Sequence, residues 1–251
     1  MSWSAVIAGA FVTAALYLLL LSLGAGLGLS SVSVWSNQGV SASTFGTASI
    51  LWIIFVEIVS SAMGGYLAGR LRTRWTVIHG DEVYFRDTAH GFLSWSAALV
   101  VTAAVLGSAA TVMIGASSSE GGLEGKATQR PNSYFVDSIL RNDTSKPEAD
   151  SAAVYDEVAT IFASSLKHGD LTGPDKSYLG HLVSVRTGLS QSDADQRVSD
   201  TYAALKQATE AARKSTAHTL LWIFIALLIG AFCASFAGTI GGKQRDKVVI
   251  L

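Results

Sequence analysis

Two glycine-rich runs followed by basic residues have the composition of a phosphate-binding loop. They are residues 61–75, SAMGGYLAGRLRTRW, and residues 231–246, AFCASFAGTIGGKQRD. A Walker-type loop requires Ser or Thr after the lysine and a glycine five residues before the Gly-Lys pair. The second run has Gln244 after Lys243 and Ala237 at the earlier position. The spacing therefore argues against nucleotide binding, and both runs are better explained as ends of membrane helices.

Glu57 is the one formally charged residue well inside a long apolar stretch, which makes it the candidate functional carboxylate. An ionised carboxylate at that depth is costly unless it is paired or hydrated. One hypothesis is a proton or cation site. The alternative is a structural carboxyl group that faces Tyr17, Thr102, Ser60 or a neighbouring subunit.

Other chemistry-bearing residues form no recognisable site. His79 and His90, with nearby carboxylates, could bind a metal by residue type, but their spacing matches no known motif and a solvated loop is the simpler interpretation. The single cysteine, Cys233, excludes an internal disulfide and multi-cysteine metal sites. No nucleophile motif is present. We therefore expect no catalytic residue, no metal, no cofactor and no enzyme activity.

Four apolar stretches are long enough to cross a bilayer as helices. The predicted spans are residues 4–29, 49–69, 91–115 and 219–241. The first has no basic n-region and is too long for a signal peptide, so we expect it to be retained. Trp3, Trp52, Trp95 and Trp222 fall near proposed span ends, as expected for indoles at the lipid–water boundary. The net charge of −1 argues against nucleic-acid binding.

Basic residues beside these stretches predict the orientation. The loop of residues 30–48 contains no charged residue, whereas basic residues follow the second and fourth spans. These predicted cytoplasmic anchors are Arg70, Arg72, Arg74, Lys243 and Arg245. The positive-inside rule places them, and with them both chain ends, on the cytoplasmic side.

Small residues recur at four-residue intervals in every span. Residues four apart share a helix face, and small side chains there let a second helix approach closely. The predicted packing residues are Gly24, Gly28, Gly65, Gly69, Gly107, Gly230, Ala234, Gly238 and Gly242. We therefore expect the membrane helices to pack through these stripes.

Several short motifs, mostly in the first half of the chain, carry a family resemblance. They are Ser2–Ala10, Gly24–Ser30, Ser43–Gly46, Gly64–Leu71 and His90–Trp95. Together they resemble a family of uncharacterised proteobacterial inner-membrane proteins that are often labelled PhnA-like. The resemblance implies a bacterial inner membrane and no known activity. A zinc-ribbon function does not carry over, because it needs clustered cysteines.

The polar region between the third and fourth spans is predicted to be helical after a flexible linker at residues 117–125. One amphipathic helix follows Pro147 and ends at Gly169, and a second runs from near Pro174 to Gly188. A third begins near Ser190 or Ser192 and should continue unbroken into the last span for about 50 residues. A turn of helix is expected at residues 134–140. The second helix is expected to bury Tyr178, Leu179, Leu182 and Val183. The third has Val198, Tyr202, Leu205 and Ala212 on one face, and the two short helices can cover part of that stripe.

The sequence thus predicts an all-α integral membrane protein with four transmembrane helices and an external, periplasmic helical domain between spans three and four. The expected parts are residues 1–115, 116–216 and 217–251. The favoured function is structural: a homo-oligomeric scaffold or accessory subunit of the inner membrane that contacts lipid and its own copies, or a membrane or periplasmic partner protein. The alternatives are a small-solute or ion conduit that uses Glu57 and a periplasmic stress sensor that acts through a partner.

Overall fold

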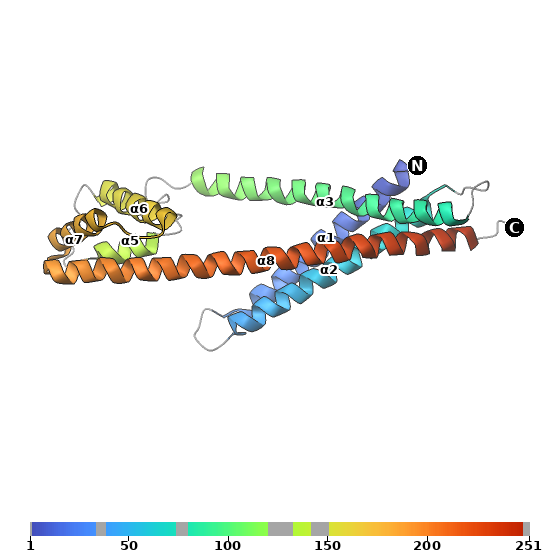
Figure 1. Cartoon of the computed structure of the whole chain (residues 1–251). Coiled ribbons are helices and arrows are strands. Elements are labelled where there is room, and N and C mark those ends of the chain that lie inside the picture. The colour runs from blue at the N-terminus through green and yellow to red at the C-terminus, as the bar shows by residue number, and fades with distance from the viewer. Residues whose placement is uncertain (1, 34–38, 74–79, 120–132, 142–150, 248–251) are drawn as a thin grey trace. The chain divides into compact units, whose positions relative to one another are not determined.

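The described part of the chain is helical throughout its regular structure, and it contains no strand (Figure 1). The computed structural model describes residues 2–33, 39–73, 80–119, 133–141 and 151–247. The helices are α1 (Trp3–Ser31), α2 (Ala42–Leu71), α3 (Gly80–Ser119), α5 (Ser133–Leu140), α6 (Ser151–His168), α7 (Gly173–Thr187) and α8 (Gln191–Lys247). This confirms the predicted all-α class.

Four of these helices, α1, α2, α3 and α8, are long and apolar enough to cross a membrane, as predicted. Helices α2 and α3 begin earlier than the apolar spans predicted from residues 49 and 91. The first turn of α2 starts after Ser41, whose side chain accepts a hydrogen bond from the backbone N–H of Thr44. A side-chain cap of this kind satisfies a backbone donor at the helix start. Polar capping, rather than the onset of the apolar run, therefore sets this boundary.

The segment before the third span is the main correction to the predicted architecture. It was expected to be a loop, but α3 begins at Gly80, so Asp87 and His90 lie on a helix. Asp81 and Glu82 occupy the first turn, where acidic side chains interact favourably with the helix dipole. At its other end α3 continues to Ser119, so the first residues of the predicted linker are also helical. Arg74, His79, Pro147 and linker residues 120–125 lie outside the described residues.

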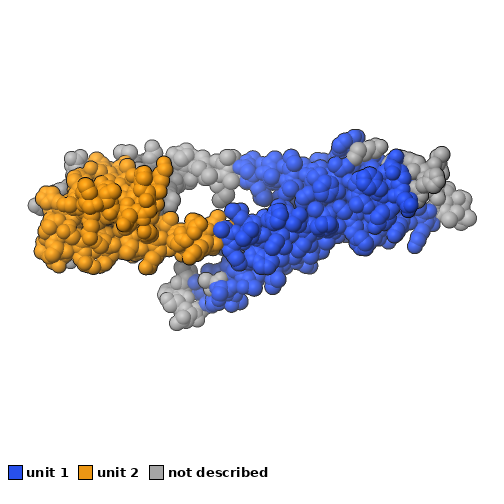
Figure 2. Space-filling view, viewed as in Figure 1, with its two compact units in different colours: residues 1–111, 217–251 blue, residues 112–216 orange. Residues whose placement is uncertain are grey.

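The chain divides into two compact units (Figure 2). Unit 1 comprises residues 1–111 and 217–251, and unit 2 comprises residues 112–216. Helix α8 contributes to both units and runs for 57 residues without interruption, as predicted. Side chains in its first half complete the core of unit 2, and those in its second half pack inside unit 1.

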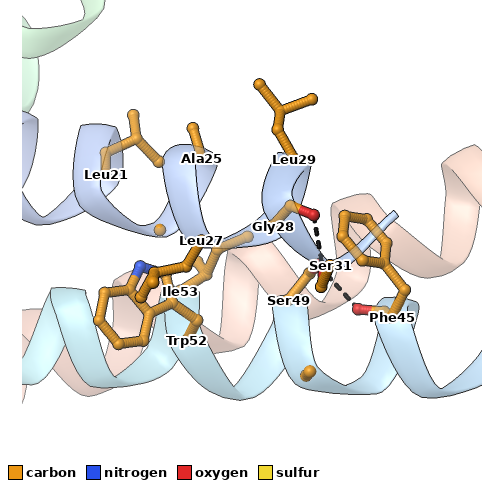
Figure 3. A pocket seen from close by; sticks show the side chains of 12 residues that line it. Leu21, Ala25, Leu27, Gly28, Leu29, Ser31, Phe45, Ser49, Trp52 and Ile53 are labelled. Carbon is orange, nitrogen blue, oxygen red and sulfur yellow. Dashed lines mark hydrogen bonds between the residues drawn. The ribbon is translucent and has the colours of Figure 1, made fainter. Parts of the chain in front are cut away.

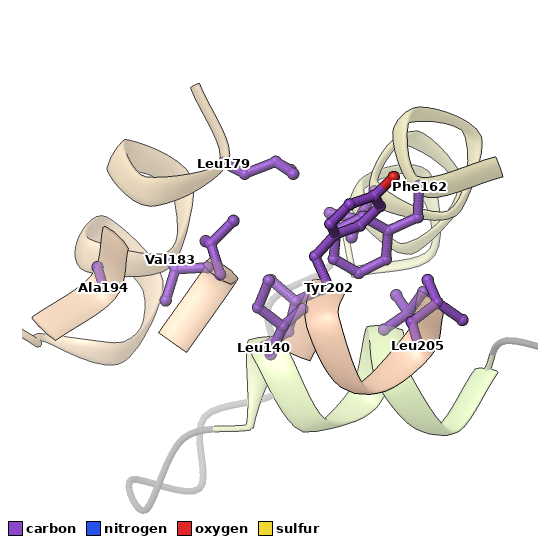
Figure 4. Close-up of a cluster of buried hydrophobic side chains, with 11 residues drawn as sticks. Leu140, Phe162, Leu179, Val183, Ala194, Tyr202 and Leu205 are labelled. Atoms are coloured by element: carbon purple, nitrogen blue, oxygen red, sulfur yellow. The ribbon is translucent and has the colours of Figure 1, made fainter. Parts of the chain in front are cut away.

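Unit 2 has its own hydrophobic core (Figure 4). The rings of Phe162 and Tyr202 pack with centroids 5.9 Å apart near its centre. Helix α7 is capped at both ends, by the Thr172 side chain and by Gly188 at φ +74°. The buried residues come from four helices: Val136, Ile139, Leu140, Val158, Phe162, Leu179, Val183, Ala194, Val198, Tyr202 and Leu205.

One residue that was expected to be buried is exposed. Tyr178 is 44% exposed, and its hydroxyl group donates to Glu157 of α6 at 2.9 Å. On the apolar face of α8, Val198, Tyr202 and Leu205 are buried in the core, whereas Ala212 is exposed, as are all residues from 211 to 220. The short helices therefore cover only the first part of α8.

Within unit 1 the helices meet at small residues. A Cβ added to Gly65 would collide with the backbone of Ala234, and one added to Gly69 would collide with the backbone of Gly238. These contacts bring α2 directly against α8. Gly24 and Gly28 of α1 also form close contacts, with the aromatic rings of Trp52 and Phe45 of α2 respectively.

Of the remaining predicted packing glycines, two contact another helix and one does not. Gly230 faces the Glu57 carboxyl group, and Gly242 faces the carboxyl group of Asp87. Gly107 of α3 differs, because nothing lies within 4 Å of an added Cβ. Most of the small stripes are thus used for packing within one chain, and the stripe of α3 is not.

Replacement of Gly65 by alanine should destabilise the bundle by about 1–3 kcal/mol, because the new methyl group overpacks the contact with Ala234. Gly46 lies in the same helix with nothing within 4 Å of an added Cβ. Gly46→Ala should leave stability unchanged or raise it by up to about 1 kcal/mol, since alanine favours helix. Unfolding of both variants by SDS in mixed micelles measures the difference, and equal effects would contradict the packing described.

Candidate functional site

Glu57 is buried within unit 1, with only 5% of its surface exposed. The hydroxyl group of Ser61 donates to its Oε1 at 3.0 Å, and the indole Nε1–H of Trp95 donates to the same oxygen at 2.9 Å. Gly230 of α8 packs against the carboxyl group from a third helix. Helices α2, α3 and α8 therefore meet at this side chain.

The local sequence explains this arrangement. Ser61 lies one turn after Glu57 and so shares its helix face. Glycine at position 230 leaves the space that the carboxyl group occupies, since any Cβ there would overlap it. Gly230 and Gly242 are twelve residues apart, which places Glu57 about 18 Å along α8 from the level of Asp87.

The hydrogen bonds at Glu57 fit a neutral carboxyl group. Both donors are uncharged and both use Oε1, as the carbonyl oxygen of a protonated acid would accept them. The second oxygen is then free to carry the proton. Keeping the group neutral avoids the large cost of an unpaired charge inside a membrane.

The partners considered from the sequence were largely different. Thr102 and Ser60 are buried, but neither bonds to Glu57, and the Ser60 hydroxyl group has no hydrogen-bond partner among the described residues. The Tyr17 hydroxyl group lies close enough to the Glu57 carboxyl group to interact with it electrostatically. Trp95 was missed because the third span was placed at Gly91, which made the indole a boundary residue. In the structure Trp95 lies fifteen residues after Gly80, where α3 begins.

A second buried polar cluster joins the ends of α2, α3 and α8. Arg72 and Asp87 are 2% and 3% exposed, and Arg72 Nε donates to Asp87 Oδ1 at 2.7 Å. Arg245 Nη1 donates to the backbone oxygen of Gly69 at 2.8 Å and lies 3.4 Å from Asp87 Oδ1. Burial lowers the pKa of the Arg72 guanidinium, and the hydrogen bond that it donates to Asp87 opposes this. The cluster therefore ties three helices through one carboxylate.

The predicted anchors behave differently from one another. Arg72 is inside the protein and paired with Asp87, whereas Lys243 is exposed and lies over the ring of Tyr84 at 5.4 Å. Arg70 is half-buried. A basic residue beside a span can therefore be a structural ion-pair partner as well as a boundary marker.

His90 is engaged by backbone groups. Its Nε2 accepts from the Ser2 N–H at 3.0 Å, and its Nδ1 lies 2.6 Å from the carbonyl oxygen of Arg86. These contacts require a neutral ring with its proton on Nδ1. Among the described residues no group of three His, Cys, Asp or Glu side chains could hold a metal ion. His90 thus links α3 to the start of α1.

No protein-family model, curated protein or solved structure matches this chain.

Replacement of Ser61 by alanine should lower the free energy of unfolding by about 1 kcal/mol, because the Glu57 carboxyl group loses one donor. Ser60 is the matched control, since it is equally buried and its hydroxyl group has no partner. Ser60→Ala should change stability by less than about 0.5 kcal/mol. Equal losses for the two neighbours, measured by SDS unfolding, would refute the assigned hydrogen bond.

Glu57→Gln should keep the fold, with a stability change of less than about 1 kcal/mol, because the amide oxygen can accept from both Ser61 and Trp95. Glu57→Leu should cost about 2–5 kcal/mol, since both donors lose their acceptor. Unfolding followed by tryptophan fluorescence compares the variants. A glutamine variant as unstable as the leucine variant would show that the carboxyl group is ionised in the folded protein.

Proposed function

We propose that this protein is a structural component of a bacterial inner membrane: a scaffold or accessory subunit that anchors a helical domain and binds copies of itself or a partner protein. The observation that carries the proposal is helix α8. Its residues 194–205 complete the core of unit 2, and its residues 230–242 pack on α2 and α3 in unit 1. One continuous helix therefore contributes to both a membrane-type bundle and a helical unit with its own core.

The geometry of Glu57 supports a structural role over a conduit. Its carboxyl group is closed in by Trp95, Ser61 and the backbone at Gly230. An ion path through a membrane needs groups that are open to water or to a succession of ligands. Glu57 instead has the surroundings of a hydrogen-bonded hub between helices.

Basic residues beside the second and fourth spans support an orientation with both chain ends in the cytoplasm. Unit 2 then lies in the periplasm, because it is formed between the third and fourth spans. It is the part of the chain that would meet a periplasmic or membrane partner.

The exposure of α3 supports self-association. Apart from Thr102, every residue from Leu99 to Ser108 is exposed. Ala103 and Gly107 form a small stripe on this stretch, and membrane helices associate through such stripes by close backbone packing. The other glycine stripes are occupied within the chain, so α3 is the surface proposed to bind a second copy.

The test is the oligomeric mass of the full chain released from native membranes, measured by native mass spectrometry. The wild type should form oligomers, and Gly107→Leu should weaken them about tenfold or more, a loss of about 1.4 kcal/mol. Gly26→Leu is the matched control, because an added Cβ on that α1 glycine also meets nothing within 4 Å. A wild-type monomer without a co-purifying protein would refute the proposal.

A further inference from the structure

An apolar groove of about 540 Å³ lies between α1 and α2 (Figure 3). It is lined by seven residues of α1 between Leu21 and Ser31 and by five residues of α2 between Phe45 and Ile53. The volume is in the range of about 300–1,000 Å³ that is typical of ligand-binding pockets. Both helices are long and apolar enough to cross a membrane, and the groove lies within their span segments. In a membrane its surroundings would therefore be hydrocarbon.

Aromatic side chains of α2 build the groove against glycines of α1. The ring of Trp52 lies on Gly24, and the ring of Phe45 lies 3.3 Å from a Cβ placed on Gly28. Figure 3 shows these two rings toward opposite ends of the groove, with α1 and α2 as its walls. The two rings hold the backbones of α1 and α2 apart at two points along the helices. The groove is the space between these two points.

The polar side chains that line the groove have already used their hydrogen-bond donors. The indole N–H of Trp52 donates to the Leu20 carbonyl oxygen at 3.1 Å. The hydroxyl groups of Ser31 and Ser49 each donate to a backbone carbonyl oxygen of their own helix at 2.8 Å. An occupant is thus offered apolar contact and no donor, and a water molecule would lack the partners it needs.

The neighbouring loop offers no charge to a lipid headgroup. Residues 32–41, which connect α1 to α2 along the chain, contain no Lys, Arg, Asp or Glu. Anionic headgroups are normally held by basic residues near the membrane surface. Recognition at this site therefore depends on the hydrocarbon chain.

We propose that the groove binds one acyl chain of a membrane lipid, selected through its chain and independently of headgroup charge. The chain fills the space between the rings of Trp52 and Phe45 and completes the packing of α1 against α2. This inference is independent of the proposed scaffold function, since it concerns a different face from the exposed stripe of α3.

The experiment uses the purified full chain in detergent, titrated with dioleoyl phosphatidylcholine and, separately, dioleoyl phosphatidylglycerol. Native mass spectrometry counts the lipids bound to each chain. We expect saturation at one tightly held lipid, with affinities for the two headgroups within about threefold of each other. Ala48→Phe, which fills the groove from α2, should weaken binding at least tenfold.

Two further variants make the result decisive. Ala25→Phe fills the groove from the α1 wall and should cause the same loss, so a folding defect in one variant does not decide the outcome. Ala104→Phe, at an exposed α3 position away from the groove, should bind lipid as the wild type does. Wild-type lipid affinity in folded Ala48→Phe and Ala25→Phe would overturn the proposal, as would a strong preference for one headgroup. Loss of oligomers without loss of bound lipid in Ala48→Phe and Ala25→Phe would assign the groove to a protein helix and also overturn the proposal.

Discussion

Close contact between helix backbones is the interaction on which unit 1 depends. In hydrocarbon the hydrophobic effect does not drive helices together, so small residues that allow tight packing take its place. Gly65 meets Ala234 and Gly69 meets Gly238, and both contacts would be blocked by one additional carbon atom. The polar groups of the bundle come within hydrogen-bond distance because these backbones are so close.

This packing buries two polar clusters at different heights along the bundle. The carboxyl group of one is charged and paired, and that of the other is neutral. At one level Arg72 and Asp87 are both ionic and form a buried pair, in which the loss of either partner would leave an uncompensated charge. About 18 Å along α8, Glu57 accepts hydrogen bonds from two neutral donors, Ser61 and Trp95, and fits a protonated acid. A paired charge near the end of a bundle and a neutral carboxyl group deeper inside are both consistent with the rising cost of charge toward the bilayer centre.

Unit 2 is stabilised by a different force. Its core brings together aliphatic and aromatic side chains from α5, α6, α7 and the first part of α8, as in a water-soluble helical domain. The same helix that ends this core at Leu205 goes on to carry Ala234 and Gly238 in the membrane-type bundle. Along this one helix the contacts therefore change from large apolar side chains to small residues.

The sequence by itself determined the helical class, the four apolar spans and the unbroken course of α8, because hydropathy and the absence of helix breakers are local properties. It also identified Glu57 and the small-residue stripes as unusual. Only the tertiary structure decided that Trp95 and Ser61 bind Glu57, that Arg72 is buried against Asp87, and which glycines are already covered. Periodicity shows which residues share a helix face, but it does not show which helix lies opposite. Side-chain partners from separate helices depend on that choice, and so do the helix starts at Ala42 and Gly80, where polar first turns extend the helices beyond the apolar segments.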